Sequence, residues 1–513
     1  MTTDSSIEKQ KYFYSRNRFL FVLIFSLGLI IRLGNYFNDP GLWYDEARLA
    51  INIIDRYYLK LLLPLDDFQV APILFLWIEK LNIVFFGASE LVLRLFPLLC
   101  SIFSLPLFYL LAKNLFKDEK TALTSLFIFA ITPIQIRYAA EVKQYMTDVL
   151  VSLILFWLFS VFLKHGNRKL LILLAFAGVI SIFLSNISVM VLFTLCVYWF
   201  TSDIFIKKKD HTKYIVMSLW LLTFCVYYYL FINNHMHEQY MLDYWQNNFL
   251  PLNPFNAEFW NFFNSRVRET FSEFMIYNQG ILVDKFDIVI INLFLIIYFA
   301  GLIFMVSRRK TTAIFFMIFP ILLHLLLSGF KKYPFEARLA LYLSPLVIMT
   351  FSYGLVKLYK LSATILKSKY PGIILMILVL SVFSYKLYIN YPIENDTIRE
   401  SIKFINVNYR ENQKVYIYYF SKPAFEYYKK TMGLNFSDAA VIGVGKGNIV
   451  SPETGLDNLK GVNGEVWLLF SHSLKRDTPD NPENIIMNGL IKRGLLMNSF
   501  QTKYSSAYLV MLK

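Results

Sequence analysis

The chain is poor in charge and in cysteine for its length. Only 17% of its 513 residues are Asp, Glu, Lys or Arg, whereas 56% are hydrophobic. A water-soluble fold cannot cover that much apolar surface. The three cysteines, Cys100, Cys196 and Cys225, all lie within apolar runs, so no disulfide framework is available to the C-terminal part. These shortages exclude a soluble globular enzyme and a disulfide-stapled C-terminal domain.

The few charges are also unevenly placed. The formal net charge is +15, and most Lys and Arg residues lie between hydrophobic runs. That placement is typical of membrane topology, so we expect no nucleic-acid partner. The runs are long enough to cross about 30 Å of hydrocarbon, and they predict about eleven transmembrane helices. The predicted spans are residues 18–37, 91–112, 120–135, 147–164, 168–185, 187–205, 213–232, 286–306, 311–329, 337–358 and 372–390.

The basic clusters between the spans predict the orientation of the chain. The first cluster, Lys9 to Arg18, resembles the start of a signal sequence, but no small-residue cleavage site follows it, so an uncleaved helix is predicted. The later clusters all fall on the same side of the predicted bundle, and the positive-inside rule assigns that side to the cytoplasm. They begin at Lys113, Lys164, Lys207, Arg308 and Lys357. We therefore expect a multi-pass protein of the cell (inner or plasma) membrane.

Three longer segments then face outward: residues 38–90, residues 233–285 and the tail from 391. Within the first, residues 71–86 are apolar but short and contain Glu79 and Lys80. This pattern favours an amphipathic helix at the membrane surface. The alternative is a twelfth span. It would move every later loop to the opposite side of the membrane, and the basic clusters would then no longer all face the cytoplasm.

The tail has the alternating pattern of a small α/β domain. Helices are predicted at 397–409, 424–430 and 485–493, and strands at 415–420, 466–470 and 507–512. Gly443, Gly445 and Gly447 form a glycine-rich stretch that fits a plain turn better than a phosphate loop, because no helix clearly follows it. The predicted fold is an α-helical membrane bundle over residues 1–390 and an extracytoplasmic α/β domain over residues 391–513.

Two adjacent acids, Asp45 and Glu46, follow the first span in the segment Gly41–Arg48. Adjacent side chains on a helix point about 100° apart, so the two acids cannot share a proton. We expect one acid to face a cleft and the other to anchor the loop, with Arg48 as its partner. The alternative is a solvated loop with incidental charge.

Two further polar clusters lie in outer turns. Glu141, Lys143 and Tyr145 occupy the turn after the third predicted span, and Glu141 and Tyr145 share a face if the turn is helical. Charges near the membrane tend to be paired or functional, although interface anchoring is the simpler explanation. The other cluster consists of Lys331, Lys332, Tyr333 and Arg338, whose cations stand on the outer side against the charge bias. A phosphate ligand explains such cations, and lipid headgroup contact is the alternative.

His235, His237 and Glu238 in the second outer segment form a possible metal site. The His-x-His-Glu spacing is a weak zinc signal, because no further ligand lies nearby.

The order of these segments resembles the polytopic GT-C glycosyltransferases, most of all the bacterial family-39-like group. That group is related to the protein O-mannosyltransferases and the lipid A aminoarabinose transferases. The resemblance is best over residues 18–200, and its motifs are fairly specific only in combination. They are Asp45-Glu46, Gln69-Val70-Ala71-Pro72, Gly87-Ala88-Ser89-Glu90 leading to Arg94, Arg137-Tyr138-Ala139-Ala140-Glu141, Tyr333-Pro334-Phe335-Glu336-Ala337-Arg338 and Val466-Trp467-Leu468-Leu469-Phe470-Ser471-His472.

The resemblance implies transfer of a hexosyl or pentosyl group from a polyprenyl-phosphate donor to a hydroxyl of a lipid, glycan or protein at the outer membrane face. It implies a catalytic Asp45, with Glu46 as the second acid. Two departures leave the sugar and the acceptor open. Val142-Lys143-Gln144 stands where relatives often show Arg-Pro, and the tail differs from the shorter endings of some relatives.

The expected chemistry needs one base and several cations. A departing phosphate is already an anion and needs no general acid, so a single base, Asp45, suffices to take the acceptor proton. Lys143, Lys331, Lys332, Arg338 and Arg94 are the cations available to the phosphate. A divalent cation held by Glu46 or Glu141 could share that role, and inversion follows from one in-line displacement.

The aromatic segment 233–285 suits an acceptor groove, with interfacial anchoring as the alternative. Two other functions compete with the transferase. A transporter or flippase of lipid-linked sugars should show internal repeats and acids within its spans, and neither is visible here. A catalytically silent scaffold is the third hypothesis.

Overall fold

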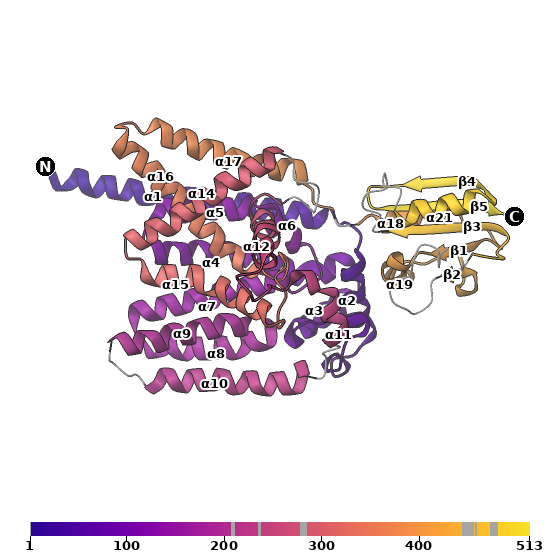
Figure 1. The fold of residues 1–513 in the computed structure, drawn as a ribbon, viewed down its shortest axis with the longest axis horizontal. Helices are drawn as coiled ribbons and strands as arrows, with labels where there is room; N and C mark the ends of the chain where they lie inside the picture. The colour runs from indigo at the N-terminus through magenta and orange to yellow at the C-terminus, as the bar shows by residue number, and fades with distance from the viewer. Residues whose placement is uncertain are drawn as a thin grey trace.

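The computed structural model describes residues 2–206, 211–233, 238–277, 285–394, 396–443, 456, 459–471 and 481–513. A helical bundle occupies most of the molecule, and a smaller α/β region lies against one of its ends (Figure 1). The N-terminus lies at the opposite end of the bundle. We call residues 391–513 the C-terminal part.

Long apolar helices form the bundle. Among the described residues, eight helices are long and apolar enough to cross a membrane, and a bent pair makes nine. The eight lie in α1 (Thr2–Phe37), α4 (Glu90–Phe116), α7 (Tyr145–His165), α10 (His211–Tyr227, continued to Ile232), α14 (Lys285–Ser307), α15 (Thr311–Gly329), α16 (Ser344–Ile365, preceded by Leu341–Leu343) and α17 (Tyr370–Asn390). Two further predicted spans are the shorter helices α8 (Arg168–Leu184) and α9 (Ser188–Ile206). Each predicted span thus overlaps helical structure, and the multi-pass helical fold is confirmed, with eight or nine spans by length among the described residues.

The third predicted span is broken in two. A single helix was predicted over 120–135, whereas α5 (Glu119–Ile131) and α6 (Pro133–Ala139) meet at 57°. Pro133 has no backbone N–H to donate, so it begins a new helix. Buried Arg32 meets carbonyl groups at the end of α5, donating to Ala130 at 2.9 Å and to Phe129 at 3.3 Å. The bend carries the chain into the polar turn at residues 140–144.

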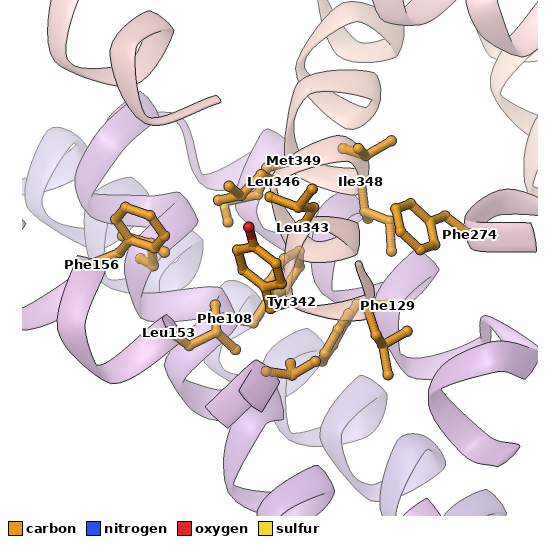
Figure 2. Close-up of a cluster of buried hydrophobic side chains, with 14 of the residues drawn as sticks. Phe108, Phe129, Leu153, Phe156, Phe274, Tyr342, Leu343, Leu346, Ile348 and Met349 are labelled. Carbon is orange, nitrogen blue, oxygen red and sulfur yellow. The ribbon is translucent and has the colours of Figure 1, made fainter. Parts of the chain in front are cut away.

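The core of the bundle is built around α16, whose first half is buried throughout. A Cβ on Gly301 of α14 would lie 2.3 Å from the Thr350 carbonyl oxygen, so glycine is what lets these two helices approach closely. Side chains from α4, α5, α7 and the start of α16 meet in one apolar cluster (Figure 2). Within it Phe108 stacks on Phe129 with ring centroids 4.4 Å apart. This packing fixes the ends of the helices from which the polar turns emerge.

Short helices cover the end of the bundle that faces the C-terminal part (Figure 1). The first outer segment forms α2 (Tyr44–Asp55) and α3 (Ile73–Phe86). With 14 residues, α3 is about 21 Å long, too short to cross the hydrocarbon. This length agrees with a surface helix and not with a twelfth span. The second outer segment forms α11 (Glu238–Tyr244), α12 (Ala257–Phe262) and α13 (Arg268–Met275).

The C-terminal part contains a five-stranded sheet in the order β2-β1-β3-β5-β4. Strand β1 pairs in parallel with β2 and β3, whereas β5 pairs antiparallel with β3 and β4. The strands are β1 (Lys414–Ile417), β2 (Val441–Gly443), β3 (Gly464–Ser471), β4 (Gly494–Gln501) and β5 (Ser505–Leu512), and the helices are α18 (Ile398–Asn408), α19 (Lys422–Thr431) and α21 (Pro482–Ile491). The α/β prediction holds.

Three local predictions in the C-terminal part need correction or fall outside the described residues. The strand predicted at 415–420 ends at Ile417, and Tyr419–Ser421 is a tight helical turn before α19. Strands β2 and β4 were not predicted, and β4 is mostly exposed on both faces, so it lacks the alternation that marks a half-buried strand. Of the glycine-rich stretch, Gly443 ends β2, and Gly445 and Gly447 lie outside the described residues.

The C-terminal part is docked on the first outer segment. The two share one apolar core, in which Leu42 and Ile53 lie with Ile402 and Phe425. Polar contacts surround that core. Arg399 contacts Asp39 at 2.6 Å and Glu90 at 3.1 Å, the Leu42 N–H donates to the Tyr428 hydroxyl at 2.9 Å, and Tyr427 donates to the Ala88 carbonyl at 2.9 Å. The C-terminal part and residues 38–90 therefore lie on the same side of the bundle.

Candidate active site

Asp45 and Glu46 lie in the first turn of α2, which begins after Trp43. Carboxylates are favoured there because the N-terminus of a helix carries partial positive charge. Their side chains diverge, as the helical spacing predicted, and each forms an ion pair of 2.9 Å with a different arginine. The two adjacent carboxylates therefore lie in different environments.

Glu46, Arg94 and the turn at Val142 form what we call the anchor cluster. Arg94 grips both oxygens of Glu46, at 3.0 and 2.9 Å, and the Val142 N–H donates to Glu46 at 2.8 Å. The other Arg94 donors reach the carbonyls of Pro40 at 2.5 Å and Gly41 at 3.3 Å. Both charged side chains are fully buried. This cluster joins α2, α4 and the turn after α6.

The anchor cluster corrects one expectation. The acid that anchors the loop does so through Arg94 and not through Arg48. Buried Arg94 directs its hydrogen bonds at Glu46 and at two carbonyl groups, and both oxygens of the fully buried Glu46 accept hydrogen bonds. The donor-phosphate role of Arg94, and the roles of Glu46 as a second acid or metal ligand, stay predictions.

Asp45, Arg338 and Lys143 form what we call the rim cluster. Arg338 contacts the Asp45 carboxylate at 2.9 Å, and their side chains are 17% and 21% exposed, so water reaches the pair. Burial works against the charged carboxylate, but Lys143, Arg338 and Arg48 together lower the pKa of Asp45 below its ordinary value. Asp45 is therefore an anion at neutral pH, at a point where three cations converge.

The two cations of the rim cluster are held by other groups. Lys143 donates to the Gln69 side chain at 2.7 Å, and burial lowers its pKa even though Asp45 opposes that shift. The Arg338 guanidinium lies over the rings of Trp43 and Trp245, at 5.9 and 5.2 Å from their centroids. Both cations are among the phosphate ligands predicted from the sequence, and both lie near Asp45 in the structure.

Glu141 and Tyr145 lie behind the rim cluster. Residues 141–144 are not helical, so Glu141 and Tyr145 do not share a helix face. Both Glu141 oxygens are buried and accept no hydrogen bond from the described residues; its ion pair is with Arg137, at 3.5 Å. Burial, opposed by Arg137, raises the pKa of Glu141 to about 7. The buried Tyr145 ring packs edge-on against Tyr138 at 5.0 Å.

The third predicted cluster divides in the structure. Arg338 joins Asp45, whereas Lys331 and Lys332 are exposed and form no ion pair within the described part of the chain. Tyr333 is half-buried and packs edge-on against His324 at 5.3 Å. Only one of its three cations is therefore placed at the candidate site.

Aromatic rings from distant segments surround the rim cluster. The ring centroid of Tyr44, next to Asp45, lies 5.0 Å from that of Phe420 and 6.2 Å from that of Tyr419, both in the C-terminal part. Arg48 donates to the Tyr419 hydroxyl at 3.5 Å. On the other side, Phe68 stacks on Tyr240 of α11 at 4.2 Å. The sequence analysis missed Tyr419 and Phe420, since it assigned them to a strand and no local signal placed them near Tyr44.

The donor set does not fit a divalent metal held by the protein alone. Within the described residues, no group of three or more His, Cys, Asp and Glu side chains could hold an ion. Glu46 is occupied by Arg94, and Glu141 contributes a single carboxylate. His235 and His237 lie outside the described residues. We therefore derive no step through a metal.

The predicted resemblance to the GT-C glycosyltransferases is confirmed by a family match over part of the chain and by solved structures that share its fold. Residues 70–229 match the family described as Dolichyl-phosphate-mannose-protein mannosyltransferase. Dolichyl-phosphooligosaccharide-protein glycotransferase 2 of Archaeoglobus fulgidus is 31% identical over 180 residues, 30% of this chain and 28% of that protein. The match thus spans less than a third of this curated relative.

Solved structures share the fold over nearly the whole chain. ArnT from Cupriavidus metallidurans, bound to undecaprenyl phosphate, has a TM-score of 0.52 at 12% identity, covering 96% of this chain and 97% of ArnT. The oligosaccharyltransferase of Archaeoglobus fulgidus, in complex with Zn and sulfate, has a TM-score of 0.52 at 11% identity, covering 95% of this chain and 72% of that enzyme. At these identities the likeness concerns the fold.

Proposed function

We propose that this protein is a membrane glycosyltransferase that moves a sugar from a polyprenyl-phosphate donor to a hydroxyl acceptor, with Asp45 as the general base. The observation that carries the proposal is the rim cluster: an anionic carboxylate, open to water, between Arg338 and Lys143. The match to a dolichyl-phosphate-mannose-dependent family and the fold of lipid-bound ArnT support a lipid-phosphate donor.

The proposed reaction is one displacement at the anomeric carbon. The acceptor oxygen attacks that carbon and gives its proton to the Asp45 carboxylate as the new C–O bond forms. The bond between the anomeric carbon and the phosphate oxygen breaks, and the lipid phosphate leaves with the electron pair. The configuration is inverted because a single in-line step takes place. Asp45 need not be a strong base, since the attacking hydroxyl becomes acidic only as its bond to carbon forms.

Arg338 and Lys143 serve the leaving group in this proposal. Without donor, Arg338 satisfies its charge on Asp45 at 2.9 Å. A bound phosphate competes for that guanidinium, and charge developing on the leaving oxygen is stabilised by fixed cations in a poorly hydrated site. When Arg338 contacts the phosphate, its ion pair with Asp45 weakens. The Asp45 carboxylate can then accept the proton more readily. Lys331 and Lys332 are exposed and are proposed to attract the donor headgroup by their charge alone.

The orientation of the site is also a proposal. The rim cluster, residues 38–90 and the C-terminal part lie at one end of the bundle, and the N-terminus lies at the other (Figure 1). The N-terminal cations and the basic ends of α4 and α7 occupy this second end. By the positive-inside rule it faces the cytoplasm, which supports an extracytoplasmic site and C-terminal part.

The aromatic rings around the rim cluster are proposed as the acceptor side of the site. Flat rings suit the apolar faces of sugars, and the rings of Tyr419 and Phe420 contact that of Tyr44, next to Asp45. Tyr240 lies near enough for Arg48 and Asp45 to affect its pKa. The C-terminal part then contributes directly to acceptor contact and covers the site. The identity of the sugar and of the acceptor does not follow from these contacts.

The test compares Asp45→Asn with Asp55→Asn, a half-exposed acid on the same helix that pairs with Lys430. Glycolipids and glycans on the outer face are measured by mass spectrometry in cells with each variant at equal membrane abundance. Removal of a general base should reduce the product by roughly a hundredfold or more in Asp45→Asn, with Asp55→Asn unchanged. Normal product with Asp45→Asn refutes the assignment. Movement of labelled donor across vesicles with no new glycosidic bond would indicate a transporter.

A further inference from the structure

A second polar site lies at the opposite end of the bundle from the rim cluster. A cavity of about 860 Å³ opens between the last turns of α4 and α7, the start of α5 and Lys360 of α16. The anchor and rim clusters lie near the first turns of α4 and α7. The cavity lies near the last turns of these helices, about 30–40 Å away along the helix axes. It is therefore independent of the proposed transfer reaction.

The cavity wall carries an excess of positive charge. Its lining includes the five lysines Lys113, Lys117, Lys120, Lys164 and Lys360 against two acids, Asp118 and Glu119. Both acids are already paired, Asp118 with Lys360 at 2.6 Å and Glu119 with Lys113 at 3.0 Å. The charges of Lys117, Lys120 and Lys164 are not balanced by an ion pair with any described residue, and all three side chains are exposed.

The same cavity has an apolar side. Leu110 precedes Lys117 by seven residues on α4, and Trp157 precedes Lys164 by seven residues on α7, so each lies about two helical turns deeper than its lysine. Val161 lies between Trp157 and Lys164 on that wall. Cations at the mouth and apolar side chains toward the membrane interior match a lipid that has an anionic headgroup and acyl chains.

Membrane topology alone accounts for lysines on this side but not for their arrangement. The positive-inside rule asks only that cations lie in these loops. Here they converge on one cavity, and Lys117 holds a left-handed backbone conformation, φ 52°, at the end of α4 where glycine is favoured. This residue is one of the five lysines that line the cavity.

We propose that this cavity binds the phosphate headgroup of an anionic phospholipid in the adjacent leaflet. Basic pockets between transmembrane helices are suited to headgroups of this kind. With three unbalanced lysines, a headgroup that carries two phosphate charges fits better than one that carries a single charge. The phosphate chemistry is shared with soluble phosphate compounds, and the apolar wall favours the lipid.

The test uses the full-length protein in detergent with lipid counted by native mass spectrometry. Lys117→Gln/Lys164→Gln is compared with Lys367→Gln/Lys369→Gln, which removes the same charge from the same end but outside the cavity lining. The probes are diphosphatidylglycerol, phosphatidylglycerol, phosphatidylcholine and inorganic pyrophosphate. Loss of two headgroup contacts should weaken diphosphatidylglycerol binding by about thirtyfold. The control pair should bind like the wild type, and phosphatidylcholine should show no preference among the proteins.

Three results overturn the proposal. If the cavity variant and the wild type retain diphosphatidylglycerol equally, the cavity is not the binding site of this lipid. Equal loss in the control pair reduces the effect to general surface charge. Pyrophosphate binding that depends on Lys117 and Lys164, without lipid binding that does so, assigns the cavity to a soluble phosphate compound. Melting temperatures of both variants confirm that the exposed substitutions leave the fold intact.

Discussion

The anchor cluster and the rim cluster begin at consecutive residues and contain ion pairs of the same length, 2.9 Å. In the anchor cluster both partners are fully buried, and each Glu46 oxygen is held by Arg94. In the rim cluster both partners are partly exposed, and Asp45 keeps oxygen capacity for another ligand. The two ion pairs have the same length, so distance does not distinguish them. Full burial, with every carboxylate oxygen hydrogen-bonded, marks the pair that stabilises the fold. Partial exposure, with oxygen atoms still able to accept, marks the pair that can exchange partners during a reaction.

The largest expected effect comes from breaking the anchor cluster. Arg94→Met leaves Glu46 charged and buried without its partner, which costs about 3–5 kcal/mol of folding stability. The variant should melt far below the wild type or fail to accumulate in membranes. The measurement is thermal unfolding in detergent, followed by size-exclusion chromatography. Glu46→Gln/Arg94→Met is the control, because it removes both charges and should recover part of the loss. A single variant that melts like the wild type contradicts the buried ion pair.

Breaking the rim cluster should instead remove activity and spare the fold. Arg338→Gln eliminates a cation beside the departing phosphate, so transfer should fall by roughly 10²–10³-fold. Its partly exposed pair with Asp45 contributes at most about 1 kcal/mol of stability. Product formation and melting temperature are measured on the same preparation. Arg266→Gln, at an exposed pair with Glu269, is the matched control. Equal losses of activity in the two variants would place the effect outside the rim cluster.

Glu141 tests how burial acts on a carboxyl group that accepts no hydrogen bond from the described residues and has only a long ion pair, 3.5 Å, with Arg137. Burial raises the pKa of Glu141 from 4.5 to about 7, with Arg137 and Lys143 opposing the shift and Glu46 adding to it. The folded protein therefore keeps a proton that the unfolded chain releases. Its stability falls as pH rises from about 4.5 to about 7, by at most ~3 kcal/mol from this group.

Glu141→Gln cannot titrate, so it should gain stability relative to the wild type over that interval and no further above pH 7. Thermal melts of both proteins between pH 5 and 8, with a chelator present, measure the difference. A difference that stays constant over this range would show that Glu141 is already ionised at pH 5. The shape of the pH dependence is the readout, because a fixed packing defect in the variant shifts the curve without bending it.

The sequence could predict the helices, the α/β tail and the divergence of Asp45 from Glu46, because each depends on residues close in the chain. Apolar runs mark the spans, and helical spacing sets two adjacent side chains about 100° apart. It could not predict their partners, since Asp45 meets Arg338 across 293 residues and Glu46 meets Arg94 across 48. No local rule separates the cation that completes a buried pair from the one that stays at the surface.

The tail shows the same limit. Val415 to Phe420 has the composition of a strand, and β1 (Lys414–Ile417) covers its first residues, but the chain leaves the sheet after Ile417 and turns into α19. α19 packs on α2 in the shared apolar core, which is a tertiary contact that the local sequence does not show. The rings of Tyr419 and Phe420 reach Tyr44 only because of it.

The smallest effect is expected within the C-terminal part, where a residue of the docked core can be compared with a residue near the rim cluster. Tyr428 accepts a hydrogen bond from the Leu42 N–H at 2.9 Å in the docked core, whereas Tyr419 lies beside Tyr44 at the rim. Tyr419→Ala removes one ring from the proposed acceptor side and should raise the acceptor KM about three- to tenfold, with kcat and melting temperature nearly unchanged. Tyr428→Phe should lower stability by about 1 kcal/mol and leave the KM unchanged. If the two substitutions raise the KM equally, the C-terminal part acts only by holding the first outer segment in place, and the rings of Tyr419 and Phe420 have no contact with the acceptor.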